Sequence, residues 1–277
     1  MPRPLKILKG ILKEDPTVTS DKINNLLGET TAISDETLTH LARCLRDLLE
    51  KDRASKADQS IVDLGVRFWN DTIAVNILIR QGLILNAMMM ERDAIETRVV
   101  AEYLHEYPRD AEAWQKAKTY KERRRFGINE LKDKVKDGEA SKDIWDWLSS
   151  YIHPNDKARP AYSKSRPFFG HNLYLGGLYD PAPTATFFLM QLATCINFLD
   201  TIYNWYKDDL LFPEELPKKI EALEEAYYKQ KGKLTKRADS EHQKMKGEIE
   251  KTRLSEEEII KMFQFLDTLH EIGNISQ

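Results

Sequence analysis

The chain has 277 residues, 41% of them hydrophobic and 31% charged, and its 42 basic and 45 acidic residues leave a net charge of −3. This length and apolar content suit one large domain with a buried core. Because the charges nearly cancel, a strongly basic protein is excluded, and any surface for nucleic acid must be a local patch. Sparse glycine and proline and the lack of alternating apolar runs favour helices over sheets.

The two cysteines, Cys44 and Cys195, are far apart and form no C-x-x-C pair. This spacing argues against a disulfide framework and a thiolate metal site, so we expect a reducing, cytoplasmic compartment. Lysines interrupt the apolar residues at the N-terminus, unlike the core of a secretion signal. The most apolar stretch, 181–199, contains two prolines and several polar side chains, and we expect a buried core helix and no membrane partner.

In chain order, residues 1–33 are predicted to form an N-terminal arm with at most a short helix near 21–27. Ser34 is a favourable N-cap followed by two acidic residues. This pattern predicts a helix that begins at Ser34 and ends near 51–55.

The stretch 57–107 has no proline and repeats apolar residues at helical spacing, but it is too long for one ordinary helix. Gly82 is the predicted break, and the proline that follows the stretch is its predicted end. Short helices are predicted over 110–118, where Asp110 is a candidate cap, and over 128–135.

Ser141 is the predicted cap of a helix that stops at Pro154. Between 154 and 183 the composition turns to proline, glycine, asparagine and aromatic residues. We predict a long irregular loop there, with a small hairpin over 168–179, and loops of this length are commonly functional or mobile. A helix over 184–207 follows.

Lysine and glutamate dominate 214–251, which predicts a solvated helix or a flexible helical extension, and Ser255 begins a further helix. The predicted fold is mainly α: a single helical bundle with a long irregular loop and a charged helical C-terminal extension. The predicted organisation is an arm at 1–33, a bundle core at 34–212, and at 213–277 the extension with a C-terminal helix that packs on the core.

Arg92 and Glu96 are candidate functional residues because they are four residues apart in an otherwise apolar row of the 83–107 helix. They are predicted to form an i, i+4 ion pair. Burying ions costs several kcal/mol unless they are well paired, so this pair either organises a core or interface, or lines a pocket.

His153 closes the helix that also carries Trp145 and Ser149 at four-residue spacing. At the last turn the helix dipole favours a protonated histidine, and Pro154 prevents continuation of the helix. His153 is thus either a structural residue at a helix end or a titratable group at the mouth of the long loop.

Two motifs carry a resemblance to a known family. Gly-x-x-x-x-Ala leads into Glu-Arg-Asp-Ala-Ile-Glu-Thr at 91–97, and Leu-Ser-Ser-Tyr-Ile-His-Pro-Asn follows at 148–155. The chain resembles an uncharacterised family of helical prokaryotic proteins with an Arg-x-x-x-Glu helix and an L-S-x-x-x-H-P motif, over about 34–207.

That family is similar in outline to the HEPN superfamily, whose members are helical bundles, often dimeric, associated with RNA cleavage, toxin systems or phage defence. The active HEPN motif has an arginine four to six residues before a histidine on one helix. Here Trp147, Leu148 and Ser149 occupy those positions before His153. The resemblance therefore implies ribonuclease chemistry only if Arg92 supplies the positive charge from another helix.

A local basic segment, 116–136, is the candidate nucleic-acid surface. It contains nine basic and three acidic residues, and its basic residues include Arg123, Arg124 and Arg125. The loop after His153 adds four more basic residues near aromatic side chains that could stack bases: Lys157, Arg159, Lys164 and Arg166. The alternative is a solvated charged face.

A metal site is a further alternative. Glu102 with His105, and Asp267 with His270, have the i, i+3 carboxylate and histidine spacing of di-iron bundles, although each pair lies near a predicted helix end. The sequence has no phosphate-binding loop, nucleophile elbow or dinucleotide fingerprint, and we expect no cofactor.

Three hypotheses follow. The first is a HEPN-like protein that binds or cleaves RNA in a defence or toxin system, with His153 as acid/base and Arg92 stabilising the transition state. Glu96 would orient Arg92, and Ser149 would be a nearby hydroxyl. The second is a non-catalytic interaction module in which Arg92 and Glu96 are structural and the Lys/Glu-rich extension contacts a protein partner. The third is the di-iron bundle. The expected partners are RNA, a helical protein, or a second copy of the chain in a homodimer.

Overall fold

The computed structural model describes residues 16–50, 55–152, 181–208 and 212–251. All regular structure in these ranges is helical, which confirms the predicted mainly α class. The predicted hairpin at 168–179 and the helix after Ser255 lie outside the described residues.

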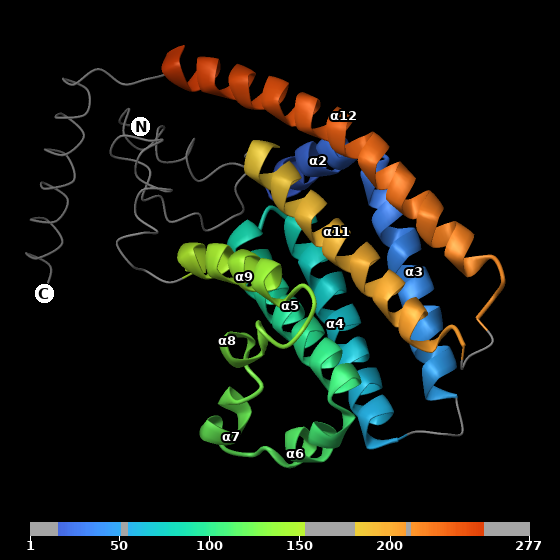
Figure 1. The fold of residues 1–277 in the computed structure, drawn as a ribbon. Helices are drawn as coiled ribbons and strands as arrows, with labels where there is room; N and C mark the ends of the chain where they lie inside the picture. Colours follow the sequence, from blue (N-terminus) through green and yellow to red (C-terminus); the bar gives the residue numbers. More distant parts are fainter. Residues whose placement is uncertain (1–15, 51–54, 153–180, 209–211, 252–277) are drawn as a thin grey trace, which may run out of the picture.

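Five long helices form the body of the bundle (Figure 1). These are α3 (Thr30–Leu49), α4 (Lys56–Arg80), α5 (Ile84–Glu106), α11 (Pro181–Tyr206) and α12 (Leu216–Lys251). Helices α4 and α5 make the most extensive contact, and α11 packs against α3, α4, α5 and α12. The core between them is rich in phenylalanine, and the rings of Phe68 and Phe198 lie 4.4 Å apart.

The predicted break at Gly82 is confirmed. Gly82 adopts a φ of 76°, which glycine tolerates without steric cost, and it separates α4 from α5. A second glycine, Gly28, has a φ of 49° and lies between α2 (Pro16–Leu27) and α3. Because the chain turns at Gly28, α3 begins at Thr30, and the predicted start at Ser34 is wrong.

Ser34 is instead buried inside α3, where its hydroxyl accepts a hydrogen bond from Nδ2 of Asn76 at 2.9 Å. Helix α2 is longer than the predicted short helix at 21–27, and Ile23, Leu26 and Leu27 are at most 1% exposed. This part of the expected N-terminal arm therefore contributes to the core.

Short helices lead from α5 to α9 and lie to one side of the long helices (Figure 1). They are η1 (Pro108–Asp110), α6 (Ala111–Lys116), α7 (Tyr120–Arg124) and α8 (Ile128–Leu131), followed by α9 (Gly138–Ile152), which packs on α5. Asp110 precedes α6, but its carboxylate accepts a hydrogen bond from the Tyr103 hydroxyl and makes no side-chain cap.

Helix α12 packs along the outer side of α11 (Figure 1). Its buried side chains include Leu216, Ile220, Leu223 and Leu234, while its lysines and glutamates are mostly exposed. The predicted charged helix therefore packs on the bundle through these apolar side chains and exposes its charged ones. Among the described residues, Thr184–Tyr206 has the length and apolar composition of a membrane span, and 67% of its most apolar window is buried in the bundle.

Candidate functional site

Arg92 and Trp145 meet at the contact between α5 and α9. The guanidinium carbon of Arg92 lies 4.2 Å from the centre of the Trp145 ring, a cation–π geometry. The Nζ atom of Lys142 lies 5.3 Å from the same ring. Two cations therefore adjoin one aromatic ring, and the Nε atom of Arg92 is buried without a hydrogen-bond partner.

The predicted ion pair between Arg92 and Glu96 is wrong, since no guanidinium nitrogen of Arg92 lies within 4.0 Å of a carboxylate oxygen of Glu96. Arg92 extends to Trp145 on α9, whereas Oε1 of Glu96 lies 3.4 Å from the place a Cβ atom would take at Gly127. The two side chains thus diverge although they share a helix face.

Ser149 is buried on α9, and its hydroxyl donates to the carbonyl of Trp145 at 2.7 Å. This bond within the helix uses the hydroxyl proton. Arg92 contacts the ring of Trp145, whereas Ser149 contacts only its backbone carbonyl. His153, which the sequence places one turn further along, lies outside the described residues.

The i, i+4 ion pair on α5 is formed by Arg98 and Glu102. Arg98 Nε lies 3.3 Å from Oε1 of Glu102, although its N–H does not point along a hydrogen bond, and both side chains are nearly buried. Nη2 of Arg98 donates to the hydroxyl of Ser141 at 2.5 Å. The predicted cap at Ser141 is wrong, because α9 begins at Gly138 and Ser141 is 1% exposed inside it.

Glu91 is the most perturbed acid of this region, and sequence reasoning did not single it out. It is 1% exposed, and its Oε1 atom has no hydrogen-bond partner. Burial raises the pKa of the Glu91 carboxyl to about 7, although the nearby Thr194 hydroxyl of α11 and the charge of Arg98 act in the opposite direction. The Thr194 hydroxyl itself donates to the carbonyl of Met190 at 3.1 Å. Glu91 is therefore a buried acid that titrates near neutral pH.

Other titratable groups surround Glu91. The carboxylate of Asp71 on α4 raises the pKa of Glu91, and the charge of Glu91 raises the pKa of the Cys195 thiol, which burial has already raised. Burial also raises the pKa of the Cys44 thiol to about 12. Both thiols stay protonated at neutral pH, which disfavours either as a nucleophile.

The Glu102 and His105 pair is engaged in packing. Glu102 is bound to Arg98, and the His105 ring stacks on Trp205 with centroids 4.3 Å apart. Burial lowers the pKa of His105. The described residues contain no group of three or more His, Cys, Asp or Glu side chains that could hold a metal ion. Asp267 and His270 lie outside them.

The basic segment 116–136 forms an exposed surface over α6 to α8. Arg123, Arg124 and Arg125 are exposed, and so is Tyr120, of which 82% is accessible. Within the described residues, only Lys116 and Lys132 of its nine basic side chains lie within 4.0 Å of a carboxylate. The loop residues Lys157, Arg159, Lys164 and Arg166 are outside the described residues.

Glu122, one of the three acids of the segment, is held by its own helix start. Its carboxylate accepts hydrogen bonds from the backbone N–H groups of Lys118 and Thr119, and these bonds lower its pKa. This is the acid half of a capping box that positions α7. The short helix thus presents its basic side chains on a fixed turn.

Comparisons of the chain with protein-family models, with curated proteins and with solved structures find no match. The likeness to HEPN proteins therefore stays a prediction from the sequence.

Proposed function

We propose that this protein binds single-stranded RNA through the basic segment 116–136. The observation that carries the proposal is the excess of cations in a segment that also exposes the ring of Tyr120, since seven of its nine basic side chains have no carboxylate within 4.0 Å among the described residues. Cations of this kind neutralise phosphates, and an exposed aromatic ring offers a face on which an unpaired base can stack. The resemblance to HEPN proteins supports RNA as the nucleic acid.

The charge pattern favours a surface for a partner over a merely solvated face. The segment has nine basic and three acidic residues, whereas α12 has ten basic and seven acidic residues. On the rest of the bundle, cations such as Lys56 and Arg237 lie within 4.0 Å of an acid. In the basic segment, Lys121 and Arg124 have no such acid among the described residues. Clustered cations repel one another, and a bound polyanion relieves this repulsion.

Reversing two of these charges is expected to weaken RNA binding at least about tenfold. The variant K121E/R124E leaves Arg123 in place, because the Nε atom of Arg123 donates to the carbonyl of Ala117 and supports the local fold. Fluorescence anisotropy with a labelled single-stranded oligonucleotide measures the Kd. The wild-type Kd should rise steeply with salt, as expected when phosphate contacts release counterions.

A matched control has the same change in net charge on another face. The variant K229E/K233E reverses two exposed lysines of α12 and should bind RNA like the wild type. Equal weakening by both variants would mean that binding follows net charge alone, and undetectable wild-type binding at low salt would contradict the proposal. Tighter binding to double-stranded than to single-stranded RNA would contradict the proposed stacking of an unpaired base on Tyr120.

Cleavage is the further step that the HEPN resemblance implies, with His153 as acid/base. His153→Ala is expected to abolish cleavage of a labelled RNA while the Kd for RNA stays within about twofold, since a catalytic group acts on the transition state. Denaturing gel electrophoresis follows the cleavage. Loss of binding in this variant, or unchanged cleavage, would count against a catalytic role.

A further inference from the structure

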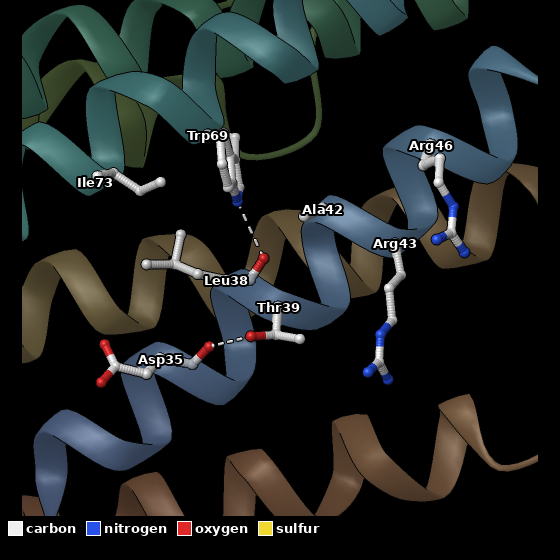
Figure 2. A pocket seen from close by; sticks show the side chains of 8 residues that line it. All are labelled: Asp35, Leu38, Thr39, Ala42, Arg43, Arg46, Trp69 and Ile73. Atoms are coloured by element: carbon white, nitrogen blue, oxygen red, sulfur yellow. Dashed lines mark hydrogen bonds between the residues drawn. The ribbon is translucent and has the colours of Figure 1, made fainter.

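Helices α3 and α4 together line a hollow of about 500 Å³ on the surface of the bundle (Figure 2). Its apolar lining comes from Leu38, Ala42, Trp69 and Ile73. The Trp69 indole N–H donates to the carbonyl of Leu38 at 3.0 Å, so covering the ring leaves no unpaired donor. None of the candidate site residues described above lines this hollow.

The apolar lining continues along α4 in both directions. Val66, Trp69, Ile73 and Ile77 are spaced by three and four residues and therefore share one helix face. Val66 is 37% exposed and Ile77 is 51% exposed. A stripe of this kind on the outside of a bundle is typical of an interaction surface.

The exposed face of α3 beside this stripe carries opposite charges at equal distances from Thr39. Asp35 lies four residues before Thr39, and Arg43 lies four residues after it. The Asp35 side chain is 64% exposed, and its carboxylate accepts a hydrogen bond from Nη2 of Arg80 at 3.0 Å. Arg43 is exposed and has no carboxylate within 4.0 Å among the described residues.

We infer that a second copy of this chain covers this face, with the two α3 helices antiparallel about a two-fold axis at Thr39. In this arrangement Arg43 of each copy meets Asp35 of the partner subunit, so one charge pattern is complementary to itself. Thr39 and Ala42 are small, and the Thr39 hydroxyl already donates to the carbonyl of Asp35 at 2.8 Å. The helices can therefore approach closely, and the stripe on α4 is covered beside them.

The register is tested by two charge reversals and their mixture. The wild type is expected to be a dimer by size-exclusion chromatography with light scattering. In R43E acid faces acid, and in D35R base faces base, so each change should raise the dimer Kd at least about tenfold. An equal mixture of the R43E and D35R chains pairs acid with base at both contacts and should form a heterodimer of near wild-type stability.

Circular dichroism checks that each variant keeps its helical fold, and K236E on the exposed side of α12 is the charge-matched control that should remain dimeric. A wild type that is monomeric up to about 100 μM overturns the inference. Unchanged dimers in R43E and D35R overturn it as well. If both variants are monomeric and their mixture stays monomeric, the antiparallel register is wrong.

Discussion

Replacing Glu91 by glutamine is expected to stabilise the protein above pH 7 by about 3 kcal/mol and to flatten the dependence of its stability on pH. The pKa of the Glu91 carboxyl is about 7 in the folded chain against an ordinary value of 4.5. The folded state therefore keeps a proton that the unfolded state releases. The contribution of neutral Glu91 to the free energy of unfolding is fully present below pH 4.5 and is lost as the pH rises through 7.

The magnitude follows from the size of the pKa shift, since one unit corresponds to about 1.4 kcal/mol. Glutamine has nearly the shape of the protonated acid and cannot ionise. Urea unfolding of wild type and E91Q at pH 5, 6, 7 and 8 measures the difference, which should grow with pH. A constant difference across this range would show that Glu91 does not titrate there.

Thr194→Val provides a control on the cause. The Thr194 hydroxyl lowers the pKa of Glu91, and its removal should raise that pKa further. The fall in stability should then extend to higher pH. If T194V instead moves the fall in stability to lower pH, the Thr194 hydroxyl stabilises the neutral acid and not the carboxylate.

The sequence located most helices because their apolar periodicity and glycine breaks are local signals. Gly82 illustrates this, since one positive φ separates two long helices. The predicted helix starts at Ser34 and Ser141 failed for a shared reason. Both serines are favourable caps, but Asn76 and Arg98 offer them buried hydrogen bonds across the bundle. A cap contributes only about 1 kcal/mol, so tertiary contacts decide the boundary.

The candidate site was harder to predict because α5 has no single exposed face. It contacts α4, α8, α9 and α11, so charges on several sides of it are enclosed. The sequence pattern predicted an ion pair between Arg92 and Glu96, whereas the nearly buried ion pair of α5 is formed by Arg98 and Glu102. Glu91 lies seven residues before Arg98, two helical turns away on the same face, and this spacing is the sequence signal that could have found it.

Arg98→Met is expected to lower the free energy of unfolding by about 3 kcal/mol at pH 7. Removing one partner of a buried ion pair leaves the other charge without compensation. Glu102 would lose its only close cation among the described residues, and Ser141 would lose a hydrogen-bond donor. The double variant R98M/E102M replaces both charges by apolar groups of similar length and should recover most of the loss. Urea unfolding of the four chains gives the coupling energy between the two sites.

The pH dependence of R98M distinguishes two causes of its lower stability. Either the packing of the Arg98 side chain is lost, or a buried carboxylate is left without its cation. Burial raises the pKa of Glu102, and Arg98 opposes this rise. Without Arg98 the pKa values of Glu102 and Glu91 should both rise further, so these carboxyls become neutral at a higher pH. The deficit of R98M relative to wild type should therefore shrink as the pH falls from 8 to 5. A deficit that is constant over this range, or a coupling energy near zero, would show that the Arg98 stem matters for packing and its charge does not.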